Sequence, residues 1–187
     1  MYYLLKEPHT FAKLRAEIFD AMASGEVSNP ITFDQAQKLP YLQAAIKEGM
    51  RLHPATGLPM WRVVPKGGVM ILGTFFPEGS MVEINTWVAH RNTNIFGPDP
   101  ARCRLERWLP DKTAPEKLAE MERYHIPFGA GTRTCLGKNI SILEMSKVIP
   151  ELVRRYDFEL LSEEMRYTNR WFVKQKDLRV RLRRLAQ

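Results

Sequence analysis

One run of residues constrains the fold of this chain more than any other, and it is Phe128-Gly129-Ala130-Gly131-Thr132-Arg133-Thr134-Cys135-Leu136-Gly137. Gly129 and Gly131 allow backbone conformations that side chains disfavour, so the run predicts a turn that can approach a flat ligand closely. Gly137 leaves the first turn of the following helix without a side chain next to the sulfur of Cys135. The turn therefore presents one thiol beside open space.

The surroundings of Cys135 favour a negatively charged sulfur. The cysteine precedes an amphipathic helix, and the unpaired amides and positive dipole at a helix N-terminus stabilise an anion. Arg133 adds a fixed positive charge whose planar fork suits carboxylates. The pattern indicates a thiolate that holds a metal through a single protein bond. A structural cysteine in a glycine-rich turn is the alternative.

A second pattern lies on a helix that we predict from Pro40 to His53. Proline is favoured in the first turn of a helix, Pro54 ends it, and apolar or small residues recur at helical spacing, namely Leu42, Ile46, Gly49 and Met50. Glu48 and Arg51 are three residues apart and are therefore neighbours on one helix face. Taken alone, such a pair is common on protein surfaces.

The glycine-rich run resembles the haem-binding signature of the cytochrome P450 monooxygenases, and the matching positions are Phe128, Gly131, Arg133, Cys135 and Gly137. The resemblance implies haem b (iron protoporphyrin IX) as the cofactor and Cys135 as the axial ligand of its iron. It also implies that Arg133 pairs with a haem propionate and that Phe128 shields the sulfur. A thiolate ligand in this family favours O–O cleavage.

The Glu48/Arg51 helix strengthens the same resemblance. It is followed by Leu52-His53-Pro54, as in the Glu-x-x-Arg helix of the family, and the run Glu106-Arg107-Trp108-Leu109 resembles the segment whose arginine completes a buried network. The implied network consists of Glu48, Arg51 and Arg107. Its implied role is structural, because it would support the loop that presents Cys135.

The loop after Pro54 contains glycine and two further prolines and leads into a strand. By resemblance it passes over the haem and lines the substrate pocket, so Thr56, Leu58 and Met60 are candidate substrate contacts. Arg62 matches a position that often binds a haem propionate. An ordinary exposed strand arginine remains the alternative for Arg62.

The resemblance covers nearly the whole chain but only the C-terminal portion of the family. It implies a mainly α-helical fold with small β-sheets (α+β), which is a truncated C-terminal part of the cytochrome P450 fold. Residues 1–187 would form a single partial domain that lacks the N-terminal half and the oxygen-activating helix. Several elements would then expose apolar surface, and the chain alone is expected to fold poorly and to bind haem weakly.

Other elements follow from periodicity and turn residues. Helices are expected over residues 10–23, 116–123 and 136–156, the last with a kink at Pro150. Strands 69–72 and 81–85 are expected to join through the turn Pro77-Glu78-Gly79, and residues 171–173 and 178–182 are expected to form a final hairpin. Trp171 and Phe172 are expected in the core, although the hairpin tip often reaches the pocket in this family.

Composition limits the cellular setting. Only two cysteines are present, Cys103 and Cys135, so a disulfide framework is not expected and reducing, intracellular surroundings are favoured. No apolar run approaches the roughly 18 residues that cross a bilayer. The resemblance implies that a full-length relative is associated with the endoplasmic reticulum membrane, through an N-terminal anchor that this chain lacks.

The net charge of +7 is concentrated near the C-terminus, at Arg179, Arg181, Arg183 and Arg184. Three interpretations remain open. These arginines form the solvated face of a strand, or they dock an acidic electron-donor protein, or they bind nucleic acid. No aromatic–basic motif or zinc spacing accompanies the charge, so no nucleic-acid partner is expected.

The resemblance implies a haem-thiolate monooxygenase that inserts one oxygen atom of O₂ into a small, apolar organic substrate. Electrons would come from NADPH through a flavoprotein reductase. The residues within the motifs resemble those of fungal members. The alternative is a catalytically inactive haem-binding fragment, or an incomplete gene model, of such an enzyme. A redox-sensing or peroxidase-like cysteine is a further alternative, but no histidine or second cysteine lies near Cys135 in sequence.

Overall fold

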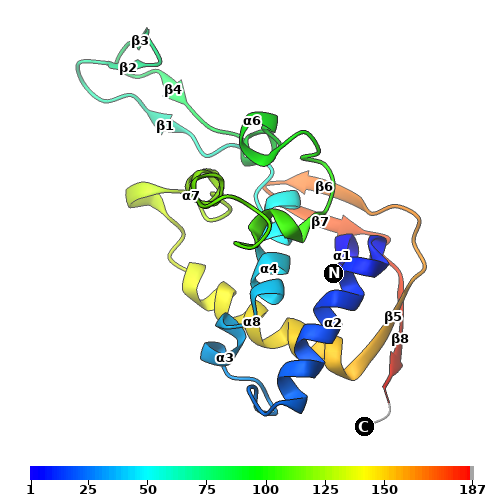
Figure 1. The fold of residues 1–187 in the computed structure, drawn as a ribbon. Helices are drawn as coiled ribbons and strands as arrows, with labels where there is room; N and C mark the ends of the chain where they lie inside the picture. The colour runs from blue at the N-terminus through cyan, green and yellow to red at the C-terminus, as the bar shows by residue number, and fades with distance from the viewer. Residues whose placement is uncertain (186–187) are drawn as a thin grey trace.

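The computed structural model describes residues 1–185, which form a helical body with short two-stranded sheets at its edges (Figure 1). The α-helices are α1 (Tyr2–Lys6), α2 (Pro8–Ala23), α3 (Phe33–Gln37), α4 (Pro40–Leu52), α5 (Thr86–Ala89), α6 (Thr93–Phe96), α7 (Pro115–Tyr124) and α8 (Lys138–Arg155). Two short 3₁₀ helices are η1 (Leu105–Trp108) and η2 (Gly131–Arg133).

The core surrounds α4, which contacts α2, α3, α8 and η1. Apolar residues at helical spacing on these elements are buried together, and they include Leu14, Ile18, Leu42, Ile46 and Val153. Burial of each such side chain contributes roughly 1.5–3 kcal/mol. The amphipathic patterns of the sequence are therefore the faces that form the core.

Helix α4 is fixed at its N-terminus by the neighbouring helix. Pro40 occupies the first turn, and the Glu17 carboxylate of α2 accepts hydrogen bonds from the backbone amides of Tyr41 and Leu42 at 2.7 and 2.8 Å. These amides have no partner within the helix, so Glu17 satisfies them and places a negative charge at the positive end of the dipole. The contact sets the position of α4 relative to α2.

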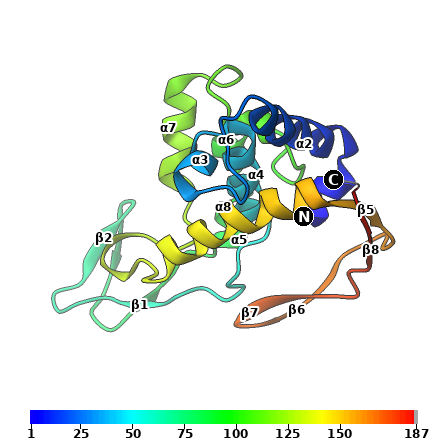
Figure 2. The same ribbon diagram turned by 90° about the horizontal axis from the view of Figure 1, so that it is seen from below.

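The predicted long helices are confirmed: α2, α4, α7 and α8 lie within two residues of the expected bounds. Helix α8 continues through Pro150, which is buried, to Arg155. Figure 2 shows α8 crossing the underside of the body from the β5 end toward the turn that precedes it. Within residues 1–185, no helix combines the length and apolarity needed to span a bilayer.

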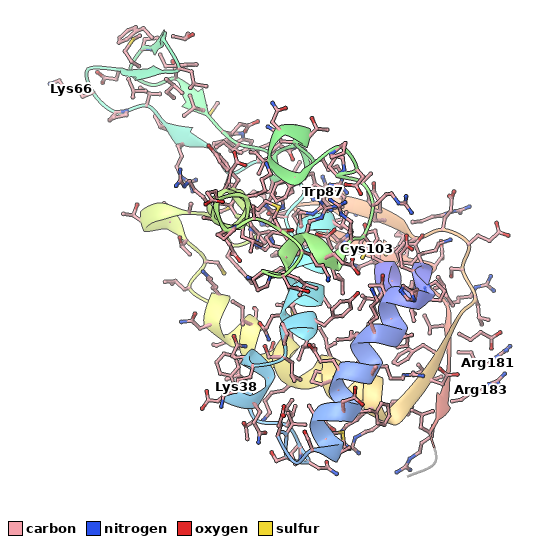
Figure 3. The ribbon with its side chains drawn as sticks, viewed as in Figure 1. Lys38, Lys66, Trp87, Cys103, Arg181 and Arg183 are labelled. Atoms are coloured by element: carbon pink, nitrogen blue, oxygen red, sulfur yellow. The ribbon has the colours of Figure 1, made fainter. Side chains whose placement is uncertain are left out.

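Four short strands form an arm that projects from the body (Figure 1). They are β1 (Arg62–Val63), β2 (Val69–Ile71), β3 (Thr74–Phe76) and β4 (Met81–Val82), and Figure 3 labels Lys66 at the far end of the arm. The expected pairing of 69–72 with 81–85 is wrong. Strand β2 pairs with β3, and β4 pairs with β1. Leu72 and Gly73 both have positive φ, 49° and 80°, which makes the tight turn that returns β2 onto β3.

The C-terminal strands are β5 (Tyr156–Leu160), β6 (Arg166–Arg170), β7 (Phe172–Lys176) and β8 (Val180–Arg184). The expected pairing of 171–173 with 178–182 is also wrong, because β6 pairs with β7 and β8 pairs with β5. Trp171, with φ of 77°, forms the turn between β6 and β7, and Asp177, with φ of 58°, directs the chain away before β8. Trp171 and Phe172 are exposed rather than in the core.

Strand β8 carries Arg181, Arg183 and Arg184, and Arg179 lies directly before it. Arg181 forms an ion pair with Glu159 on β5 at 2.7 Å, and Arg183 lies 3.6 Å from the same carboxylate. Both side chains are largely exposed and point away from the body (Figure 3). This exposure is compatible with a solvated strand face and with a docking face for an acidic partner.

Candidate functional site

Cys135 lies on the turn between η2 and α8, and its side chain is exposed. The turn has left-handed backbone at Gly129 and Gly131, with φ of 75° and 66°, as the sequence predicts. The Cys135 amide donates to the Phe128 carbonyl at 2.9 Å, which closes the turn. Both glycines are therefore needed for the backbone path that presents the sulfur.

Gly137 is the residue before the first turn of α8. A Cβ atom there would lie 3.8 Å from Cys135 Sγ, at ordinary van der Waals distance. The chain itself therefore has room for a methyl group at this position. What the glycine keeps free is space beside the sulfur, where a bulky ligand would lie.

The surroundings of Cys135 fit a large, flat, apolar group that carries carboxylates. Leu136, Ile140 and Leu143 expose apolar side chains beside the turn and along the first part of α8. The α8 N-terminus has no side-chain cap. The Lys138 amide donates to the Cys135 carbonyl at 3.3 Å, and the amides of Asn139 and Ile140, without partners among residues 1–185, remain available to a negative charge. Arg133 is exposed and forms no hydrogen bond with residues 1–185, so its guanidinium is free for a carboxylate.

Arg62 lies on the exposed strand β1 at the base of the arm. Its guanidinium donates to the carbonyls of Met60 and Trp61 at 3.1 and 2.9 Å, which are its own neighbours in sequence. These local bonds leave other guanidinium hydrogens without partners in the described residues. The geometry is compatible with both interpretations of Arg62.

The loop after Pro54 is held by the β6–β7 hairpin. The Gly57 amide donates to the Trp171 carbonyl at 3.0 Å, and the Val173 amide donates to the Ala55 carbonyl at 2.8 Å. Thr56 also pairs with Phe172 as an isolated β-bridge. The hairpin tip therefore meets the loop that sequence analysis proposed as a pocket wall.

The three proposed pocket residues differ in exposure. Leu58 and Met60 are exposed, and Thr56 is partly buried. The Thr56 carbonyl accepts a hydrogen bond from the Trp87 indole at 3.2 Å. Thr56 is thus fixed from two sides, whereas Leu58 and Met60 present free apolar side chains.

The structure brings together Glu48, Arg51 and Arg107 in the core. Arg51 donates from Nε and Nη2 to the two carboxylate oxygens of Glu48, at 2.8 Å each. Arg107 Nε donates to Glu48 Oε1 at 3.1 Å. All three side chains are almost completely inaccessible to solvent. The pair that would be ordinary on a surface is here a buried bidentate ion pair.

Glu48 has two further partners that the sequence pattern does not indicate. The Trp108 indole donates to Oε2 at 2.8 Å, and the Arg104 amide donates to Oε1 at 3.0 Å. Burial alone would raise the pKa of Glu48, but the hydrogen bonds and charge of Arg51, with the charge of Arg107, outweigh it and hold the pKa below its ordinary value. Glu48 is therefore a fully hydrogen-bonded carboxylate.

The arginines also hold backbone carbonyls of the segment between the arm and α7. Arg51 Nη1 donates to the carbonyls of His90 and Pro100 at 2.8 and 2.6 Å, and Arg107 Nη1 donates to the Phe96 carbonyl. Each arginine thus binds the Glu48 carboxylate and also fixes backbone carbonyls between the arm and α7.

His90 is a buried residue beside the site that the sequence patterns do not indicate. It is completely buried, and its Nε2 accepts a hydrogen bond from the Ile126 amide at 3.0 Å. The His90 ring stacks at 5.3 Å on that of His125, which also packs on Trp108. No local pattern marks His90, because its role depends on a partner 36 residues away in sequence.

Cys103 bears on the redox-cysteine alternative. Both cysteines are free thiols, and burial raises the pKa of Cys103 to about 12. A thiol with that pKa stays protonated at neutral pH and is a poor resolving partner for Cys135. Within residues 1–185, no group of three or more histidine, cysteine or acidic side chains could bind a metal ion.

Comparison with known proteins gives one consistent result. The sequence model of a family described as "Cytochrome P450" matches residues 1–179. A pisatin demethylase of Fusarium vanettenii is 48% identical over 176 residues, which covers 93% of this chain and 32% of that protein. A cytochrome P450 monooxygenase of Aspergillus terreus is 47% identical over 160 residues, which covers 86% of this chain and 32% of that protein.

Solved structures agree with the sequence relatives. A retinoic-acid-bound cyanobacterial CYP120A1 aligns with a TM-score of 0.80 and 28% identity, and the alignment covers 97% of this chain and 40% of that one. A CYP102L1 crystal structure aligns with a TM-score of 0.81 and 29% identity over 98% of this chain. The chain therefore has the fold of part of these proteins, and it spans about a third of the length of the curated relatives it matches.

Proposed function

The chain belongs to the cytochrome P450 family, and from this premise we propose that it is the haem-binding part of a haem-thiolate monooxygenase. Residues 1–187 would form one partial domain of that fold. The observation that carries the proposal is the exposed thiol of Cys135, presented by two left-handed glycines next to the uncapped start of α8. The fungal relatives named as monooxygenases support it.

The residues of the turn have distinct roles in this proposal. Cys135 binds the iron of haem b as a thiolate, and Phe128, whose carbonyl fixes the Cys135 amide, shields the sulfur. Gly131 and Gly137 leave room for the macrocycle. Arg133 pairs with a haem propionate because its guanidinium is exposed and has no partner among residues 1–185, and Arg62 is the second candidate.

The chemistry that haem supplies when bound is the reductive activation of O₂, in which one oxygen atom enters an organic substrate and the other leaves as water. The chain contributes orientation and exclusion of water. Thr56, Leu58 and Met60 lie on the loop that the β6–β7 hairpin fixes, so they are placed to contact a small, apolar substrate.

The two electrons for each turnover would come from NADPH through a flavoprotein reductase. The proposed partners are therefore that reductase, O₂ and the organic substrate. Association with the endoplasmic reticulum membrane is proposed for the full-length relatives.

A second candidate function is haem binding without turnover by this chain alone. It is favoured by the coverage of only about a third of the relatives and by the many exposed apolar side chains, including Trp61, Phe75, Leu136 and Ile140. Substrate oxidation with NADPH and a reductase, assayed for this chain and for a version extended with the upstream portion of a relative, separates the two. Product from the chain alone would contradict the second candidate.

The experiment that tests haem ligation is titration of the chain with haem, followed by reduction and addition of CO. Wild type and the control Cys103→Ser should show the thiolate-type Soret band, and Cys135→Ser should not, because serine does not provide a thiolate. A thiolate-type band that persists in Cys135→Ser would remove Cys135 from the ligand role.

A further inference from the structure

The segment 126–137, which carries Cys135, has little support from burial. None of its residues is buried, and most of residues 130–137 are exposed. Its backbone hydrogen bonds are local, such as Gly129 to Ile126 at 3.0 Å and Cys135 to Phe128 at 2.9 Å. These bonds fix the shape of the turn, but they do not fix its position relative to the body.

Among the hydrogen bonds of residues 1–185, one connects this segment to a part of the chain that precedes it. The Ile126 amide donates to Nε2 of His90 at 3.0 Å. An acceptor nitrogen carries no proton, so this hydrogen bond requires a neutral His90 with its proton on Nδ1, which is buried and has no partner among residues 1–185. Burial, the main cause, lowers the pKa of His90 to about 4, which favours the same neutral form.

His90 is itself fixed by the buried ion network. Its carbonyl accepts a hydrogen bond from Arg51 Nη1 at 2.8 Å, and its amide donates to the Thr86 carbonyl at 2.9 Å. Its ring packs against those of Phe96 and His125. The backbone of His90 therefore belongs to the Glu48/Arg51 network, while its side chain reaches the cysteine segment.

We infer that His90 is a positioning residue for Cys135. Its neutral Nε2 accepts a hydrogen bond from the Ile126 amide and so fixes the start of the segment. Two local hydrogen bonds, from the Gly129 amide to the Ile126 carbonyl and from the Cys135 amide to the Phe128 carbonyl, then fix Cys135 relative to Ile126. The buried ion network thus acts on the cysteine turn through one side chain. The inference rests on the proposed function of Cys135 as the haem ligand.

The test compares two amide side chains of different length at position 90. His90→Gln places an acceptor oxygen near the position of Nε2, whereas the shorter His90→Asn does not reach it. Amide hydrogen exchange of the full chain without haem is the measurement. In His90→Asn, exchange at Ile126 and Cys135 should become about tenfold faster, which is the expected effect of losing one buried hydrogen bond.

Two comparisons decide the result: whether His90→Gln restores the wild-type rate, and whether the change is confined to the cysteine segment. His90→Gln should keep the wild-type rate at Ile126, and the core amide of Ile46 in α4 should be unchanged in both variants. Equal rates at Ile126 in wild type, His90→Gln and His90→Asn would overturn the inference. So would an equal acceleration at Ile46 and Ile126, because that indicates a general loss of stability.

A third variant removes the donor instead of the acceptor and leaves the core intact. Ile126→Pro has no amide hydrogen, so it should accelerate exchange at Cys135 even if His90→Asn does not fold. Unchanged protection at Cys135 in Ile126→Pro would contradict the inference.

The haem-loaded chain gives a separate readout. The share of the thiolate-type ferrous–CO band should fall in His90→Asn and return in His90→Gln. If wild type itself gives no thiolate-type band, the proposed function fails, whereas the exchange data still decide whether His90 positions the segment.

Discussion

At the scale of single residues, Glu48 determines the energetics of the site. It accepts hydrogen bonds from Arg51, Arg107, Trp108 and the Arg104 amide, so all of its acceptor capacity is used inside the protein. A buried ion pair adds little net stability, since desolvation offsets the attraction, but loss of one partner leaves an uncompensated charge. Its contribution is therefore to specify one arrangement of the loops around α4.

This arrangement predicts a large effect for Arg107→Leu. The variant should lower the free energy of unfolding by about 3–5 kcal/mol, because Glu48 loses a positive neighbour in the core. Arg104→Leu is the matched control, since its exposed side chain pairs with Asp99 at 3.4 Å and exposed pairs contribute only about 0–1 kcal/mol. Denaturant titration measures both. Similar losses in the two variants would contradict the role of Arg107.

The buried histidines predict a loss of stability in mild acid. Burial is the main cause that lowers the pKa of His90 to about 4 and the pKa of His125 to about 3, from an ordinary value of 6.5. The unfolded chain therefore binds protons below pH 6.5 that the folded chain does not bind. Stability should be complete above pH 6.5 and should fall by about 2 kcal/mol for each histidine at pH 5.

Denaturant titration at pH 7 and pH 5 measures this effect. The window stays above the ordinary pKa of 4.5 for glutamate, so Glu48 does not contribute. The double variant His90→Gln/His125→Phe should lose most of the difference. An unfolding free energy that is the same at both pH values in the wild type would exclude the neutral, buried state of the two rings.

At the scale of elements, the turn before α8 contains one glycine that matters for folding, Gly131, and one that matters for ligand binding, Gly137. Gly131 needs its left-handed φ of 66° although nothing lies within 4 Å of a Cβ there. At Gly137, whose φ is −80°, an added Cβ would lie 3.8 Å from Cys135 Sγ. Gly131→Ala should therefore cost about 1–2 kcal/mol of stability through backbone strain. Gly137→Ala should cost less than about 1 kcal/mol.

Gly131→Ala should cause the larger loss of stability, whereas Gly137→Ala should cause the larger loss of haem affinity. The added methyl group at position 137 lies beside the sulfur, so Gly137→Ala should weaken haem binding in a titration more than its small effect on unfolding explains. If Gly137→Ala binds haem as tightly as wild type, the macrocycle does not occupy the space beside Gly137.

The sequence was sufficient for the long helices, because they depend on local patterns. The apolar spacing in α2, α4 and α8 needs no knowledge of the partner. Strand pairing could not be predicted in the same way. Strand β5 pairs with β8 across two intervening strands, and the turns depend on Leu72 and Trp171, which take positive φ without being glycine. His90 could not be found for the same reason, since its proposed positioning role depends on a contact with Ile126, which is distant in sequence.

At the scale of the whole molecule, the accessible surface is 12013 Å². A compact monomer of 21.7 kDa exposes about 9,200 Å², so this chain exposes roughly 2,800 Å² more than its mass requires. Part of the excess is the projecting arm, and part is apolar surface on α8, where Ile140, Leu143 and Val148 are exposed. Such surface promotes association.

The chain alone is therefore expected to bind a hydrophobic dye such as ANS and to unfold with low cooperativity. A matched version extended with the upstream portion of a relative should bind less dye and melt sharply. Light scattering with the melt would show association of the shorter form. A monomeric chain that melts sharply and binds no dye would contradict this expectation.

The central claim is the bond between the Cys135 sulfur and haem iron, and X-ray absorption at the iron edge of the haem-loaded chain tests it most directly. The account predicts one sulfur among the nearest neighbours of iron in wild type and in Cys103→Ser, and none in Cys135→Ser. A wild-type spectrum with only nitrogen and oxygen neighbours, or a sulfur neighbour that remains in Cys135→Ser, would contradict it.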